Sequence, residues 1–275
     1  MIAGAAAHNW MFEAGAAGFI SSIQVLIIPG DGRFTAEQVR ATALPDQPHF
    51  SPTRLVSLEN THNMGGGRVW AADAVTAVVT AARELGLACH LDGARLWNAA
   101  AASGRSLAEL ADGFDTVSLC LSKGLGAPAV SVLCGSRGLI ARARRVRRIL
   151  GGAMRQAGIL AAGGIYGIEH HRARLVEDHA NARLLARGLN EIEGLRVELD
   201  AVDTNIVMVS LTGAAVEGRE LVRRAGTRGV HFFAVRPDVL RFVTHLDVSR
   251  ADCLRAVEVV SACVTERRAV AMKAP

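Results

Sequence analysis

The residue best suited to covalent chemistry is Lys123, one of very few lysines in a chain of 275 residues. It directly follows a predicted strand and shares its loop with Ser122, Gly124 and Gly126, where the small residues let another group approach closely. A lysine that its surroundings push toward neutrality can form a Schiff base with a carbonyl compound. Such chemistry needs an electron sink, and pyridoxal phosphate (PLP) is the common one. A surface lysine in an ordinary loop is the alternative.

The carboxylate that PLP requires on its ring nitrogen is available in Asp92. This residue also ends a predicted strand, and it precedes Lys123 by 31 residues, the length of one strand–helix–strand step. Taken alone, Asp92 could equally cap the helix that follows it. Because the two residues end adjacent predicted strands, the pair is more specific than either member and predicts a PLP site.

Three other groups of residues could support different chemistry. His90 and Asp92 could form a metal pair, but no third ligand accompanies them, so we predict no metal site. His170, His171 and His179 lie in a helical pattern and are predicted to be surface residues. A basic run could bind nucleic acid, but without interleaved aromatic residues it favours a solvated helix face or a subunit contact. That run contains Arg142, Arg144, Arg145, Arg147 and Arg148.

The elements that must position these residues alternate between short β-branched runs and longer helical patterns. This alternation predicts an α/β fold with a mostly parallel sheet, in which ligands bind beyond the carboxyl ends of the strands. The strands predicted at residues 116–121 and 131–135 are separated by too few residues for a helical crossover and are therefore predicted to be antiparallel. The predicted strands are residues 22–29, 54–59, 88–92, 116–121 and 131–135, and the predicted helices are 35–43, 72–85 and 106–111.

The second half of the chain is predicted to begin with helices and end with a smaller α+β domain. Long apolar periodicity over residues 154–192 is broken by Gly163 and Gly164, and strands are expected at 205–211 and 240–244. We therefore expect a large cofactor-binding domain over residues 1–170 and a small domain over 171–275.

Composition narrows the class of protein further. Half of the residues are hydrophobic and 21% are charged, which excludes a disordered chain. The five cysteines have no CxxC spacing and favour a reduced, cytoplasmic protein. No apolar run is long enough to span a bilayer and the N-terminus lacks the basic region of a signal peptide, so we predict no membrane partner. The net charge of +5 fits either a phosphate-bearing cofactor or nucleic acid, and does not by itself require a partner.

Several long motifs closely resemble the low-specificity L-threonine aldolase family, whose members are PLP enzymes of fold type I. These motifs are AHNWMFEAGAA (7–17), LENTHN (58–63), HLDGARLWNA (90–99), LCLSKGLGAP (119–128), GGAMRQAGILAA (151–162), EDHANARLLARGL (177–189) and RFVTHLDVS (241–249). The resemblance covers essentially the whole chain in order, and it implies the PLP-dependent transferase-like fold and a homotetramer with sites shared between subunits.

The resemblance implies the following cofactor contacts. Lys123 would bind PLP as a Schiff base, Asp92 would keep the ring nitrogen protonated, and His8 would stack on the face of the ring. Ser122 would contact the phosphate, and Arg95 would lie beside the cofactor. Lys123 and His8 are also expected to be catalytic.

The resemblance also implies the substrate contacts. Arg95 and Arg241 would bind the substrate carboxylate, because two bidentate contacts hold both its distance and its plane. His62 would be the third catalytic residue and would move the proton of the substrate hydroxyl. Arg155, and with it Arg148, would reach the site of a neighbouring subunit.

The implied reaction is the retro-aldol cleavage of L-threonine or L-allo-threonine between Cα and Cβ, which yields acetaldehyde and glycine. The alternatives are another PLP reaction on the same fold, such as β-elimination, racemisation or transamination, and an inactive pseudo-enzyme or interaction partner. The chain departs from the family before Ala7, where relatives carry a first βα unit with a phosphate-holding glycine–threonine loop. We therefore expect this 275-residue chain to bind PLP weakly and to have little or no activity alone.

Overall fold

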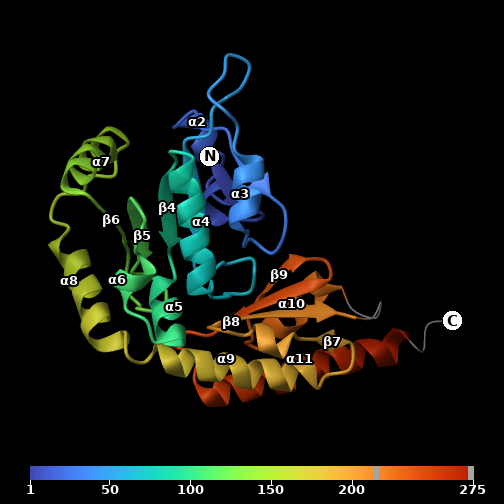
Figure 1. Ribbon diagram of the computed structural model, residues 1–275. Coiled ribbons are helices and arrows are strands. Elements are labelled where there is room, and N and C mark those ends of the chain that lie inside the picture. The colour runs from blue at the N-terminus through green and yellow to red at the C-terminus, as the bar shows by residue number, and fades with distance from the viewer. Residues whose placement is uncertain (213–216, 272–275) are drawn as a thin grey trace. The chain divides into compact units, whose positions relative to one another are not determined.

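The computed structural model describes residues 1–212 and 217–271 (Figure 1). The chain divides into two compact units, Met1–Ala173 and Arg174–Pro275. Each unit has its own sheet: six strands in the first and four in the second. The predicted α/β class with a mostly parallel sheet is confirmed.

The sheet of the first unit has the strand order β2-β1-β3-β4-β5-β6. All neighbouring pairs are parallel except β5 and β6, which are antiparallel as predicted. Thr116 of β5 faces Gly135 of β6, and Cys120 faces Ser131. The strands are β1 (Ile2–Gly4), β2 (Leu26–Ile28), β3 (Leu55–Glu59), β4 (Ala88–Gly93), β5 (Thr116–Cys120) and β6 (Ser131–Gly135).

Two helices of the first unit begin at a reciprocal side-chain cap. Thr35 accepts the Gln38 N–H while the Gln38 side chain accepts the Thr35 N–H, and this reciprocal pair starts α3 (Ala36–Thr42). Ser106 and Glu109 start α6 (Leu107–Leu110) in the same way. The other helices are α1 (His8–Met11), α2 (Ala16–Phe19), α4 (Ala72–Glu84), α5 (Leu96–Ser103), α7 (Arg137–Ile149) and α8 (Gly158–Tyr166).

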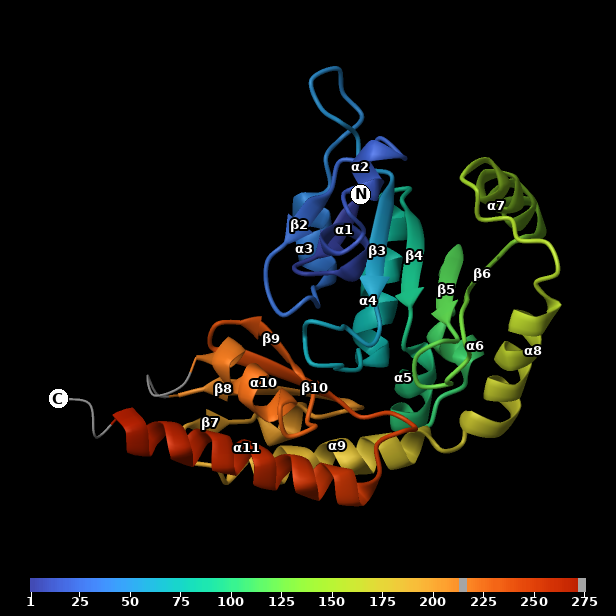
Figure 2. The same cartoon turned by 180° about the vertical axis from the view of Figure 1, so that it is seen from behind.

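The core of the first unit lies between its sheet and α4, which stands in front of the strands in Figure 1 and behind them in Figure 2. Val78 and Ala82 of α4 are fully buried, as are Val56 of β3 and Cys89 of β4. Strands that are buried on both faces read as near-continuous apolar runs, which explains why β3 and β4 were recognisable from sequence.

The break expected at Gly163 and Gly164 is wrong, because both residues lie inside α8. Their role is close packing: a Cβ on Gly163 would come within 2.6 Å of Pro128, and one on Gly164 within 3.0 Å of Leu121. The helix instead runs into a π-helical turn, Gly167–His171.

The second unit is an antiparallel sheet in the order β7-β8-β10-β9, accompanied by three helices. Its core includes Val207, Leu240 and the stacked rings of Phe232 and Phe242, whose centroids are 4.2 Å apart. His179 belongs to this buried part, so its expected surface position is wrong. The elements are α9 (Leu175–Asn190), β7 (Leu195–Arg196), a 3-10 turn (Leu199–Ala201), β8 (Ile206–Leu211), α10 (Gly218–Gly226), β9 (Phe233–Arg236), β10 (Val239–Val243) and α11 (Arg250–Ala271). Every helix in the described part of the chain is too short or too polar to span a lipid bilayer.

Candidate active site

The candidate site lies at the carboxyl ends of β3, β4 and β5. Glu59, the last residue of β3, is paired in register with Asp92 of β4, and Asp92 is paired with Ser118 of β5. Lys123 follows the end of β5 by three residues. Parallel pairing therefore brings residues far apart in the sequence to one edge of the sheet.

Asp92 is a buried carboxylate whose Oδ1 accepts the Ala94 N–H at 3.1 Å. Its own carbonyl oxygen accepts the Asn60 N–H at 2.9 Å, which joins the loop after β3 to the end of β4. The side chain is thus oriented by the turn that immediately follows its strand, and β4 is held to the neighbouring loop.

Lys123 is half-buried in the loop between β5 and β6. Its carbonyl oxygen accepts the Gly126 N–H at 2.9 Å, which closes a tight turn with Gly126 at φ +66°. Burial lowers the pKa of the Lys123 amine, and the positive charge of Arg95 lowers it further, while Asp92 and Glu59 oppose the shift. A larger fraction of the amine is therefore neutral than for an exposed lysine, and the neutral amine is the nucleophilic form.

Ser122 directly precedes Lys123 in the chain, and Arg95 acts electrostatically on the Lys123 amine. The Ser122 hydroxyl is 3.3 Å from the Cys120 sulfur. Arg95 immediately precedes α5, and its Nη1 donates to the Asn63 Oδ1 at 3.1 Å. The structure thus connects Arg95 to the loop after β3, although 32 residues separate the two partners.

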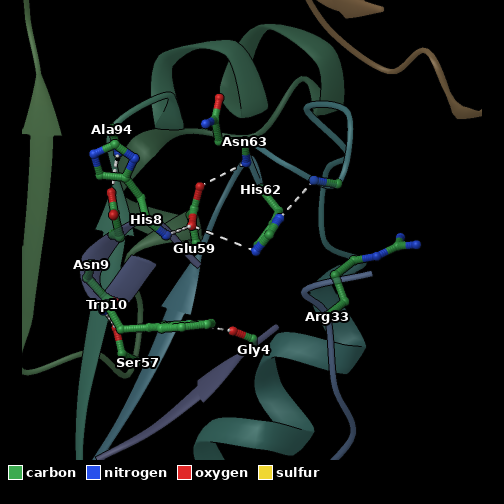
Figure 3. A network of polar contacts seen from close by, with 12 residues as sticks. Gly4, His8, Asn9, Trp10, Arg33, Ser57, Glu59, His62, Asn63 and Ala94 are labelled. Atoms are coloured by element: carbon green, nitrogen blue, oxygen red, sulfur yellow. Dashed lines mark hydrogen bonds and ion pairs between the residues drawn. The ribbon is translucent and has the colours of Figure 1, made fainter. Parts of the chain in front are cut away.

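His8 begins α1 and presents a partly exposed imidazole ring (Figure 3). Its Nε2 lies 3.0 Å from Oε1 of Glu13, and its ring stacks on Phe12 with the centroids 5.4 Å apart. Its backbone N–H donates to Oε2 of Glu59 at 2.7 Å. The start of α1 is therefore bound directly to the end of β3.

His62 is more enclosed than its predicted role implies, since only 1% of its side chain is exposed. Its Nδ1 accepts the Gly65 N–H at 2.9 Å, and its Nε2 lies 3.7 Å from Oε2 of Glu59. Gly32 packs so closely on the ring that a Cβ there would lie 2.1 Å from Nε2. Burial lowers the pKa of His62 to about 4, so the ring is neutral near pH 7.

Three predicted arginines belong to segments other than β3, β4 and β5. Arg148 is an exposed residue of α7, and Arg155 is exposed in the segment between α7 and α8. Arg241 is half-buried on β10 of the second unit, opposite Met208 of β8. Within the described ranges 1–212 and 217–271, no group of three or more His, Cys, Asp or Glu side chains could hold a metal ion.

The sequence prediction overlooked Glu59 and Asn63, although both lie in the LENTHN motif. Glu59 is 5% exposed and contacts the backbone of both His8 and Asn63. A signal was available: Glu59 ends a buried strand in the same manner as Asp92, and a carboxylate in that position could have been singled out by the same reasoning.

Comparison with known proteins gives a consistent result. The family model described as beta-eliminating lyase matches residues 1–213. The low specificity L-threonine aldolase of Escherichia coli (strain K12) is 42% identical over 253 residues, covering 90% of this chain and 72% of that protein. Among solved structures, Leishmania major threonine aldolase has a TM-score of 0.78 at 20% identity, covering 96% and 77% of the two chains. A serine palmitoyltransferase from S. paucimobilis with bound PLP has a TM-score of 0.71 at 19% identity, covering 98% and 67%.

Proposed function

Because this chain belongs to the beta-eliminating lyase family and is similar to low-specificity L-threonine aldolase over most of its length, we propose that it cleaves L-threonine and L-allo-threonine to glycine and acetaldehyde with PLP as cofactor. The observation that carries the proposal is the gathering of Lys123, Asp92 and Arg95 at the carboxyl ends of adjacent strands. An amine, a carboxylate and a guanidinium in one place match an aldehyde-bearing cofactor and an anionic substrate.

The groups present in the site suit PLP. The half-buried amine of Lys123 has a lowered pKa, and the buried carboxylate of Asp92 acts on it electrostatically. We assign Lys123 to the aldehyde carbon of PLP, Asp92 to its ring nitrogen, His8 to the ring face and Ser122 to the phosphate. When bound, PLP supplies the electron sink that accepts the electron pair of the breaking Cα–Cβ bond.

The chain's own residues would then orient the substrate and move its protons. Arg95 is proposed to bind the substrate carboxylate through a bidentate contact, which helps to set the torsion of the bond that breaks. His62 is proposed to accept the hydroxyl proton, for which a pKa of about 4 supplies the neutral ring at pH 7. Since its Nδ1 accepts the Gly65 N–H, a proton can reach that atom only after this hydrogen bond opens.

We further propose that the active form is an oligomer of this chain, because α7 and α8 expose large apolar side chains. Ile149 is 72% exposed and Ile159 is 83% exposed, and the arginines of α7 lie on the same segment. Exposed apolar surface of this kind marks an interaction site. A second copy seated there would also bring Arg155 to a shared site. The five cysteines, all free, support a reduced cytoplasmic location.

The test is a product assay on the purified chain with PLP and L-threonine. We expect glycine and acetaldehyde in equal amounts, formed slowly because this chain is expected to bind PLP weakly, and loss of both with Lys123→Ala. Lys273→Ala, which removes the other lysine of the chain, serves as the control and retains activity. The description of the matching family as beta-eliminating lyase favours β-elimination as the second candidate function. A keto acid with ammonia in place of glycine would establish that reaction instead.

A further inference from the structure

Glu59 is a buried carboxylate to which the proposed chemistry assigns no part. It ends β3, is 5% exposed, and its pKa is raised by burial and by the neighbouring charge of Asp92. Burying a carboxylate is costly unless hydrogen bonds compensate, so a group kept in such a place is expected to have structural partners.

Both oxygens of Glu59 accept short hydrogen bonds from backbone N–H groups of different segments. Oε2 accepts from His8 at 2.7 Å, across 51 residues of sequence, and Oε1 accepts from Asn63 at 2.8 Å (Figure 3). These two donors oppose the raised pKa, because they stabilise the ionised form. One carboxylate therefore joins the start of α1 to the loop after β3.

The connections of Glu59 extend to two further residues of the site. Nε2 of His62 lies 3.7 Å from Oε2, the same oxygen that accepts the His8 N–H. Asn63, whose backbone donates to Oε1, accepts from Arg95 through its side chain. Since Nδ1 of His62 already accepts a hydrogen bond from Gly65, the neutral ring carries its proton on Nε2, on the side of Glu59.

We infer that Glu59 is a positioning residue: its two carboxylate oxygens hold His8 and the His62–Asn63 loop in fixed relation, and through Asn63 they orient Arg95. The kinetic consequence of this inference rests on the proposed function, whereas the structural consequence does not. An imidazole over the cofactor and a guanidinium on the substrate are useful only when both are aligned with the lysine.

Glu59→Gln is the informative variant, because it keeps the size of the side chain and removes one acceptor. The glutamine amide can accept through its oxygen but presents an NH₂ group to the second backbone N–H. Either the His8 or the Asn63 hydrogen bond must therefore be lost, while the side chain still fills the space at the end of β3.

The first measurement is amide hydrogen exchange on the cofactor-free protein, followed by mass spectrometry of peptides covering residues 5–12 and 60–68. In the wild-type protein we expect the His8 and Asn63 amides to be protected, and in Glu59→Gln we expect at least one of these peptides to exchange about tenfold faster. Asp115→Asn is the matched control. Its Oδ2 accepts both the Cys89 N–H at 2.7 Å and an Arg83 N–H at 2.8 Å at the opposite end of the strands, so any faster exchange should be confined to the peptides containing Cys89 and Arg83.

The second measurement separates positioning from simple stabilisation. With saturating PLP, we expect Glu59→Gln to lower kcat by about 10²-fold with a smaller change in KM, whereas Asp115→Asn keeps both constants within a factor of about two. Unprotected His8 and Asn63 amides in the wild-type protein would overturn the inference, even if the variant fails to fold. So would equal kcat values for a folded Glu59→Gln and the wild type. A wild type without aldolase activity contradicts the proposed function and leaves the exchange experiment to decide this inference.

Discussion

Glu59 and Asp92 face each other in register across the β3–β4 ladder, so two buried carboxylates lie side by side near the carboxyl ends of adjacent strands. Their partners differ, which separates their roles. Glu59 accepts the N–H of His8, 51 residues away, and the N–H of Asn63, whereas within the described part of the chain the Asp92 carboxylate accepts only the Ala94 N–H of its own turn. Asp92 is thereby left with the greater capacity to contact a bound ring nitrogen.

Replacing Asp92 by Asn is expected to retain much of the PLP binding and to lower kcat. The amide cannot stabilise a proton on the ring nitrogen as a carboxylate does, and loss of one such electrostatic contact costs about 10²–10³-fold in kcat. Steady-state kinetics with a PLP absorbance titration checks this. Asp112→Asn, at an exposed position, is the control. A kcat within threefold of the wild type for Asp92→Asn would contradict the assigned role.

The buried His62 is expected to make the first unit less stable at acidic pH. Burial lowers its pKa to about 4, so between that value and pH 6.5 the unfolded chain binds a proton that the folded chain does not. The free energy of unfolding therefore falls as the pH drops through this window, by about 3 kcal/mol at its lower end.

Denaturation followed by tryptophan fluorescence measures this effect, because Trp10, Trp70 and Trp97 all lie in the first unit. His62→Gln should flatten the pH dependence of the free energy of unfolding between pH 4 and 6.5, even if it lowers stability overall. His49→Gln, in an exposed loop, is the control and should leave that dependence unchanged. An unchanged slope in His62→Gln would show that other groups cause the acid sensitivity.

Replacing Gly32 is expected to destabilise the protein, because Gly32 contacts the His62 ring. A Cβ at Gly32 would lie 2.1 Å from Nε2, and its φ of +97° is unfavourable for any L side chain. Gly86 has a φ of +69° but nothing within 4 Å of its Cβ position, so Gly86→Ala incurs only the backbone cost, about 1–2 kcal/mol. Gly32→Ala should destabilise the protein by about 1–3 kcal/mol more than Gly86→Ala. Urea unfolding compares the two; equal losses would mean that the ring moves aside freely.

A shared site predicts complementation between two inactive variants. If Arg155 acts in the site of a neighbouring subunit, a mixed oligomer of Lys123→Ala and Arg155→Ala contains some sites with both residues intact. We expect each variant alone to have little activity, and unfolding and refolding the two together to restore a substantial part of it. The control mixture combines Lys123→Ala with Arg187→Ala, a substitution on α9. Its activity should be that of the Arg187→Ala subunits alone. Failure of the mixture to exceed its components would place Arg155 outside a shared site.

The sequence by itself determined the class of fold, the antiparallel pairing of β5 with β6, and the residues that could take part in catalysis. Buried strands such as β3 and β4 are apolar runs ended by polar residues, and the motifs around Asp92 and Lys123 are long enough to identify the family. These features are local, since they depend on residue type and spacing along the chain.

Only the tertiary structure decided which of these residues meet and how they are held. The contact between Glu59 and the His8 backbone spans 51 residues, and the enclosure of His62 depends on Gly32 from another loop. The glycines of α8 indicate a helix break when only the sequence is considered, because their packing partners lie in distant segments. Burial, hydrogen-bond geometry and pKa depend on neighbours that parallel pairing brings together, and local sequence does not encode those neighbours.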